Sequence, residues 1–157
     1  MALFDIVEKH FINQGWSDDK KYCVTDRDGR KYLLRISSIS KYQRKKTTYA
    51  MMKCVAELGI PMCRPLEFGT CEEGVYILQT WIDGVDAECV IKTHSAAKQY
   101  QYGLEAGRIL KRIHSIPAPE EQEDWEIRFQ RKMDRKIQSY HNCPVKYDHG
   151  EIFIDYI

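Results

Sequence analysis

The chain has 157 residues, the size of one domain, or of one small lobe with part of another. Apolar residues make up 43% and charged residues 30%, a mixture that can offset chain entropy by burial, which argues against a disordered chain. Lys and Arg number 24 against 23 Asp and Glu, and the net charge of +1 argues against a surface dedicated to nucleic acid or to anionic lipid.

The start of the chain, MALFDIVEKHF, is not typical of a signal peptide, because it carries Asp5 and no charged region precedes its short apolar stretch. No apolar run reaches membrane-spanning length, so no membrane contact is expected. Six cysteines are scattered without a Cys-x-x-Cys pair, which favours reduced thiols over a disulfide framework or a metal site. The expected compartment is therefore the cytoplasm.

The amino-terminal segment is predicted to form one helix and a two-stranded hairpin. Apolar residues at helical spacing predict a short helix over residues 2–11, which Gly15 ends. Residues 20–25 and 31–36 have strand character, and the Asp-Arg-Asp-Gly sequence at 26–29 is a strong hairpin turn.

A longer helix is predicted next. Ser40 can cap it, and it should run to about Leu58, where Gly59 and then Pro61 stop it. Its basic segment, residues 41–46, could be a patch for nucleic acid. Because the net charge is near zero, we interpret this segment as a solvated helix face instead.

Residues 63–86 predict a second hairpin, with its turn at 69–74 and its second strand running on to about residue 82. Asp83-Gly84 then ends the strand pattern. Main-chain groups near residues 79–82 are thereby left at a strand exit, where they could meet a flat heterocycle. We interpret this exit as a candidate nucleotide site.

The remainder of the sequence is helical in pattern. Helices are predicted over residues 95–114 and about 121–140, and a final apolar-periodic piece spans 152–157. The order of elements separates a mixed lobe, residues 1–81, from a helical part, residues 82–157.

Five segments carry a resemblance to a known family: QGWSDDKKY, GRKYLLRIS, GIPMCRPLEFG, VYILQTWIDGVD and GLEAGRILKRIHSIP. In this order they resemble the amino-terminal part of the aminoglycoside phosphotransferase family, whose relatives include choline kinase and, more distantly, protein kinases. The resemblance covers essentially the whole chain. It implies an α+β fold in which a kinase-like lobe, an antiparallel sheet with one long helix, precedes the first helices of an incomplete helical lobe.

The resemblance also implies an ATP site with four candidate residues. Ser17, in the turn 15–19, would lie over the triphosphate. Arg35 stands where the family usually has a basic residue, often Lys, that holds the α and β phosphates. The backbone of Thr80 and Ile82 would meet the adenine edge. From the residues alone, an ordinary polar turn would be the favoured interpretation of residues 15–19, and the less favoured alternative for Arg35 is a side chain extended at a strand edge.

One departure from the family concerns the acid that usually pairs with this basic residue. The matching helix position is Thr48, and Glu57, the helix's only acid, lies more than two turns away. We therefore expect ATP binding that is weaker or differently arranged than in a typical member. Trp81 either lines the cleft or packs, and His114 suits helix capping or packing better than catalysis.

The family takes its catalytic carboxylate and its magnesium ligands from an His-Gly-Asp loop with a following Asn, and from a later Asp. His149-Gly150-Glu151 resembles the loop, but Tyr156 stands where the Asn is expected. Asp18, Asp19 and Asp83 lie in turns, where Asp is common for local hydrogen bonding. We therefore assign no catalytic and no metal-binding residue.

Three functions remain open. The first is a truncated phosphotransferase, inactive alone, whose intact relatives use Mg-ATP and a small hydroxylated acceptor such as an aminoglycoside antibiotic. The second is a non-catalytic module that binds a nucleotide or a protein partner. In the third, another chain completes the fold, and helices left uncovered by truncation self-associate. The sequence does not indicate which acceptor is used.

Overall fold

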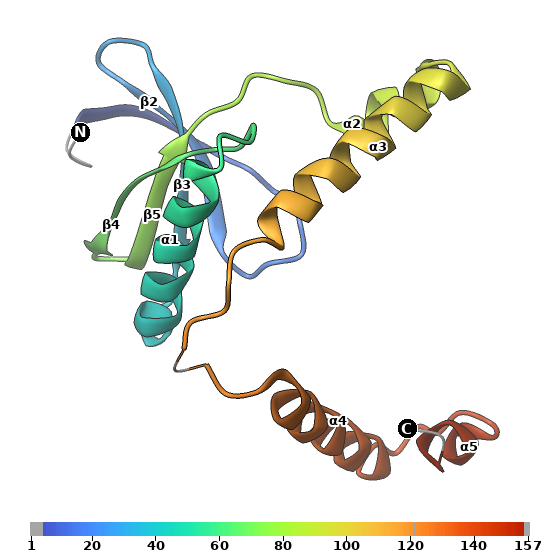
Figure 1. The fold of residues 1–157 in the computed structure, drawn as a ribbon. Coiled ribbons are helices and arrows are strands. Elements are labelled where there is room, and N and C mark those ends of the chain that lie inside the picture. Colours follow the sequence, from blue (N-terminus) through green and yellow to red (C-terminus); the bar gives the residue numbers. More distant parts are fainter. Residues whose placement is uncertain (1–4, 121, 156–157) are drawn as a thin grey trace. The chain divides into compact units, whose positions relative to one another are not determined.

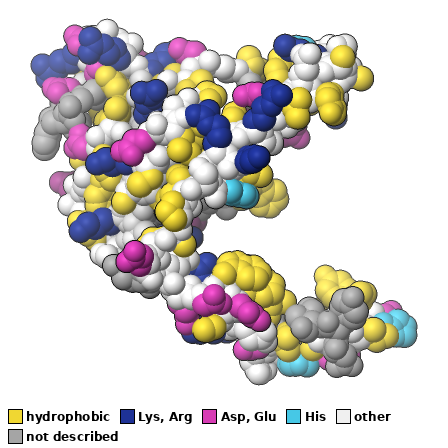
Figure 2. Space-filling view, in the orientation of Figure 1, with side chains coloured by type: hydrophobic (Ala, Val, Ile, Leu, Met, Phe, Trp, Pro, Cys, Tyr) yellow, Lys and Arg dark blue, Asp and Glu magenta, His cyan; other side chains and the backbone are white. Residues whose placement is uncertain are grey.

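The computed structural model describes residues 5–120 and 122–155, and it divides into two compact units, Met1–Ile116 and Pro117–Ile157 (Figure 1). The first unit holds the sheet with its helices, and the described residues of the second form two helices. Charged and hydrophobic side chains are interspersed on the surface that Figure 2 shows. The predicted α+β class is confirmed.

Five strands form one antiparallel sheet in the order β1-β2-β3-β5-β4. Their bounds are β1 (Ile6–Phe11), β2 (Lys20–Asp26), β3 (Lys31–Ser37), β4 (Pro65–Cys71) and β5 (Gly74–Thr80). Both predicted hairpins are confirmed. In the first turn, Gly29 adopts a φ of 78°, and Oδ1 of Asp26 accepts hydrogen bonds from the backbone N–H groups of Asp28 and Arg30.

The predicted opening helix is wrong where the structure describes it, because these residues form β1, an edge strand paired with β2. Pairing places the Phe11 ring 5.6 Å from that of Tyr22, and it places Lys9 Nζ 4.1 Å from the centre of the same Tyr22 ring. Such cross-strand contacts stabilise a strand over a short helix whose spacing is only weakly periodic. Leu3, part of that predicted helix, lies outside the described residues.

One face of the sheet carries the apolar core. Strand register sets Leu34 of β3 opposite Leu78 of β5, and Ile36 opposite Tyr76, so these four side chains share a face. Val24 of β2 joins them, and all five side chains are buried. Deep burial of this cluster accounts for much of the sheet's stability.

The long helix α1 (Tyr42–Glu57) packs on the opposite face (Figure 1). Register aligns Arg35 of β3 with Ile77 of β5, and Ile77 with Phe68 of β4. The Phe68 ring lies 5.3 Å from that of Tyr42 and 5.6 Å from that of Tyr49, both on α1. The face that carries Arg35 is therefore the face against which α1 is anchored.

The predicted start of this helix needs correction. A 3-10 turn (Ile39–Lys41) precedes α1, and its cap is Ser38, whose side chain accepts from the backbone N–H of Ser40. Sequence alone did not separate the two serines, because either can cap. The predicted stop is confirmed, since Gly59 has a φ of 65° just beyond α1.

Helices follow the strand exit. They are α2 (Ala87–Val90), a 3-10 turn (Ile91–Thr93), α3 (Ala96–Ile113), α4 (Trp125–His141) and α5 (Gly150–Asp155). Ser95 caps α3 as predicted, while Asp124 caps α4, later than the predicted start near residue 121, which lies outside the described residues. Tyr156 and Ile157 also lie outside them. In the described ranges, every helix is too short or too polar to cross a bilayer.

Candidate functional site

Arg35 is held by a buried carboxylate from the loop before β2. Its Nη2 donates to Oδ2 of Asp19 at 2.7 Å. The same oxygen accepts from Nζ of Lys45, on α1, at 2.6 Å, and Oδ1 accepts from the hydroxyl of Ser37 at 2.7 Å. The Asp19 side chain is only 2% exposed. We call these four residues the Asp19 cluster.

The charges of this cluster determine the ionisation of its carboxyl group. Burial by itself raises the pKa of Asp19, but hydrogen bonds from Lys45, Ser37 and Arg35 outweigh burial and lower the pKa from 3.8 to about 2. The carboxylate is therefore ionised at neutral pH. One negative charge faces two positive ones, so the cluster keeps a positive excess.

A further cation lies beside the cluster. Lys21 is the cross-strand partner of Arg35 and so lies on the same face. Its Nζ donates to the carbonyl oxygen of Gln14 at 2.6 Å, which ties the loop before β2 to the sheet. From the other side, Lys41 forms an ion pair with Asp18. The loop is thus fastened by cations at both ends.

Two interpretations from the sequence are corrected here. Asp19 does not serve its own turn, because its partners come from β3 and α1. The basic segment of α1 is not simply solvated, since the Lys45 side chain is only 15% exposed. Hairpin register could have located Asp19, because the pairing of Lys20 with Ile36 extends to place Asp19 near Ser37.

Thr48 occupies the position of α1 where the family usually has an acid, and it carries no charge that could pair with Arg35. Thr48 directs its hydroxyl to the carbonyl oxygen of Arg44 at 2.9 Å, within α1. Arg35 therefore takes its acidic partner from the loop, in place of the helix. That partner could not be named from the family pattern, because the pattern directs attention to α1.

The other predicted contacts stay predictions, although the structure narrows one of them. Ser17 is exposed in the same loop as Asp19. Thr80 ends β5, and its backbone N–H already donates to the carbonyl oxygen of Arg64 at 2.9 Å. Only its carbonyl group is therefore a candidate for an adenine contact. Ile82 is exposed just beyond β5. The indole N–H of Trp81 donates to the carboxylate of Asp83 at 3.0 Å.

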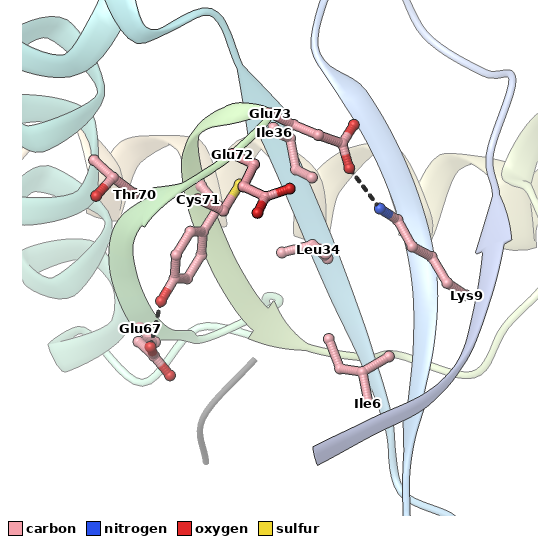
Figure 3. Close-up of a pocket in the computed structure, with 10 residues that line it drawn as sticks. Ile6, Lys9, Leu34, Ile36, Glu67, Thr70, Cys71, Glu72 and Glu73 are labelled. Atoms are coloured by element: carbon pink, nitrogen blue, oxygen red, sulfur yellow. Dashed lines mark hydrogen bonds and ion pairs between the residues drawn. The ribbon is translucent and has the colours of Figure 1, made fainter. Parts of the chain in front are cut away.

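A pocket of about 600 Å³ lies on the opposite face of the sheet, away from the Asp19 cluster (Figure 3). Leu34 and Ile36 are among its apolar lining residues. Its rim includes Glu67, which accepts from the Tyr76 hydroxyl, and Glu73, which pairs with Lys9 at 2.9 Å. Burial and then the bond to Glu67 raise the pKa of Tyr76 to about 12. With Glu72 also at the rim, this pocket repels phosphate, so it does not suit a nucleotide.

A magnesium ion would need free carboxylates near the phosphates. Asp19 does not fit that role, because its two oxygens already accept from Arg35, Lys45 and Ser37. Asp18 is exposed, and its Oδ2 is paired with Lys41. Nowhere in the described ranges do three His, Cys, Asp or Glu side chains gather in a way that could hold a metal ion. We therefore derive no step through a metal from these residues.

A family model described as "Phosphotransferase enzyme family" matches residues 10–155, which is nearly the whole chain. No curated protein matches the chain.

Proposed function

This chain belongs to the phosphotransferase enzyme family, and from that premise we propose that its sheet unit binds ATP as the phosphoryl donor. The acceptor in the intact enzyme would be a small hydroxylated molecule. One observation carries the proposal: the Arg35 guanidinium is fixed by Asp19 on the face that α1 covers, next to the loop 15–19. A guanidinium fixed in this way can bind phosphate oxygens without losing further side-chain freedom.

The residues of this chain would act on the donor side of the reaction. In phosphoryl transfer the bond between the γ-phosphorus and the β–γ bridging oxygen breaks, a bond to the acceptor oxygen forms, and the acceptor proton passes to a base. Arg35 and the loop N–H groups would neutralise and orient the triphosphate. Ile82 and the Thr80 carbonyl would position adenine. We assign no base, and we propose that the chain alone binds ATP without turnover.

The test is calorimetric titration of the full chain with ATP. We expect a Kd between about 10 μM and 1 mM, and we expect Arg35→Met to weaken binding by about 10-fold or more because a charged hydrogen-bond donor is lost. Arg30→Met is the matched control: Arg30 is exposed in the first hairpin turn, and its loss should change the Kd by less than about twofold. No detectable binding at millimolar ATP would refute the proposal.

A second candidate is a non-catalytic nucleotide-binding module, favoured by Thr48 at the acid position and by Asp18 and Asp19 being held by cations. Both candidates predict that the chain alone transfers no phosphoryl group, and incubation with Mg-ATP and a panel of aminoglycosides, macrolides and choline tests that shared prediction. Transfer at about 1 s⁻¹ or faster to any of these acceptors would contradict both the second candidate and our proposal that the chain alone is inactive. We also propose a role in aminoglycoside resistance and a cytoplasmic location, where thiols stay reduced.

A further inference from the structure

We propose that Asp19 is a positioning residue that aims two cations, Arg35 and Lys45, at adjacent phosphate groups, so that Lys45 of α1 is a second phosphate-binding side chain. The ligand class is a nucleoside di- or triphosphate. This inference rests on the proposed function, which it deepens by naming a helix-borne lysine and a loop aspartate as parts of the phosphate site.

The geometry of the shared oxygen carries the inference. Arg35 Nη2 and Lys45 Nζ both bond to Oδ2 of Asp19, at 2.7 and 2.6 Å, although they come from a strand and from a helix. One carboxylate oxygen therefore fixes the separation of two cationic heads. Without that carboxylate, the two like charges would repel each other and their side chains would separate.

Both cations keep unused donors. The Arg35 Nε–H is buried and has no partner among the described residues, and the structure gives only Nη2 of this guanidinium a side-chain partner. Lys45 donates to Asp19 alone among the described side chains, which leaves further ammonium N–H groups. The Arg35 side chain is 33% exposed and that of Lys45 15%, so solvent, and with it a ligand, can reach both.

The charge balance favours an anion with more than one negative centre. Asp19 neutralises one of the two cations, and Lys21 on the neighbouring strand adds another. A single phosphate could bond one cation well, whereas a chain of phosphates could bond cations from β3 and α1 together. We therefore expect Lys45 to contribute little to the affinity for AMP and much to the affinity for ADP and ATP.

The experiment titrates wild type and variants with ATP, ADP, AMP and inorganic tripolyphosphate, in EDTA, by calorimetry. We expect Lys45→Met to weaken the binding of ATP and of tripolyphosphate by about 5- to 20-fold, because a charged donor is lost. The binding of AMP should weaken by less than about twofold. Lys45→Arg should restore most of the affinity. The matched control is Lys46→Met, the same charge change at the exposed next position of α1, with an expected effect below about twofold.

Asp19→Asn separates positioning from simple electrostatics. It makes the site more positive, so a site that works by charge alone would bind tripolyphosphate more tightly. A positioning role predicts the reverse, a loss of about fivefold or more. Tighter binding by Asp19→Asn, or unchanged binding by Lys45→Met, would overturn the inference. Circular dichroism checks folding, and if Asp19→Asn does not fold, the Lys45→Met and Lys45→Arg pair still decides.

The outcomes also separate this inference from the proposed function. If wild type binds ATP and Lys45→Met binds it equally well, the inference fails and ATP binding stands. If tripolyphosphate binds in a Lys45-dependent way but ATP binds no more tightly than tripolyphosphate, the cluster is a polyphosphate site and adenine recognition fails. If wild type binds neither ligand, both proposals are refuted.

Discussion

The carboxylate of Asp19 accepts hydrogen bonds from three side chains and has almost no contact with water. The three donors lie on β3 and α1, outside the loop that carries Asp19. Burying a charge in this way costs free energy, and here three hydrogen bonds, two to Oδ2 and one to Oδ1, offset that cost. The group is therefore both a stabilising element and the anchor of the candidate site.

The first prediction at this scale concerns acid stability. The folded pKa of Asp19 is lowered from 3.8 to about 2, so the unfolded chain binds more protons between these values. Its contribution, about 2 kcal/mol, is fully present above about pH 4 and is lost as the pH falls through about 2. Urea unfolding of wild type and Asp19→Asn should show a stability difference that shrinks across this window.

Other acids, such as Glu73, also have lowered pKa values, so wild type alone would not isolate this effect. The difference between the two proteins does isolate it, because both keep those acids. A difference that stayed constant from about pH 7 to about pH 2 would show that the ionisation of Asp19 does not stabilise the fold.

Residue by residue, the sequence located Arg35 but not its partners. Strand pattern and family resemblance both pointed to Arg35, because they are local signals. Asp19 was interpreted as a turn residue, although hairpin register could have placed it beside Ser37. Lys45 was interpreted as a solvated residue, since its role depends on which side of α1 faces the loop. Tertiary placement decides that orientation, and no periodicity in α1 shows it.

At the scale of elements, Phe68 of β4 is an aromatic contact that anchors α1 to the sheet, through Tyr42 and Tyr49. Phe68→Ala should lower the free energy of unfolding by about 2 kcal/mol, less than for a fully buried ring because Phe68 is half-buried. It should also weaken ATP binding, since α1 carries Lys45. Chemical denaturation and calorimetry measure the two effects.

Leu66→Ala is the control for this prediction, because Leu66 lies on the same strand and is 45% exposed. It should cost less than about 1 kcal/mol and leave ATP binding unchanged. If Phe68→Ala lowered stability but left the ATP Kd equal to wild type, the position of α1 would not matter for the site.

Elements with strong local signals were predictable, and one without them was not. The two hairpins and the cap of α3 depend on turn and capping residues, which can be recognised locally in the sequence. β1 depends on pairing with β2, so its residues were assigned to a helix. The start of α1 was displaced by a 3-10 turn that has no distinct signature.

At the scale of the whole molecule, the predicted lobes, 1–81 and 82–157, and the compact units, Met1–Ile116 and Pro117–Ile157, place the boundary differently. Limited digestion with a glutamate-specific protease can distinguish these two positions of the boundary. Exposed Glu120 and Glu123 lie just after the boundary between the units, and exposed Glu88 lies just after the strand exit. We expect first cleavage at Glu120 or Glu123, because proteases cut most readily in exposed segments next to the boundary between compact units.

Mass spectrometry of the early fragments gives the answer. A stable fragment ending at Glu120 or Glu123 would support the division into units, whereas first cleavage at Glu88 would support the lobe boundary at the strand exit. Glu57, at the end of α1, serves as an internal control, because a helical site within the folded unit should be cut late.

Self-association through the helices stays a prediction, and the charges on β1 bear on which surface a second copy would use. An edge strand with unpaired main-chain groups invites another strand to add to it, which is a common start of aggregation. β1 lies at the sheet edge and carries Glu8, Lys9 and His10 in succession, so a second copy pairing there would bring charges into a sheet. These charges disfavour the addition of a second copy along β1, so we expect the predicted self-association to use the helices and not this edge.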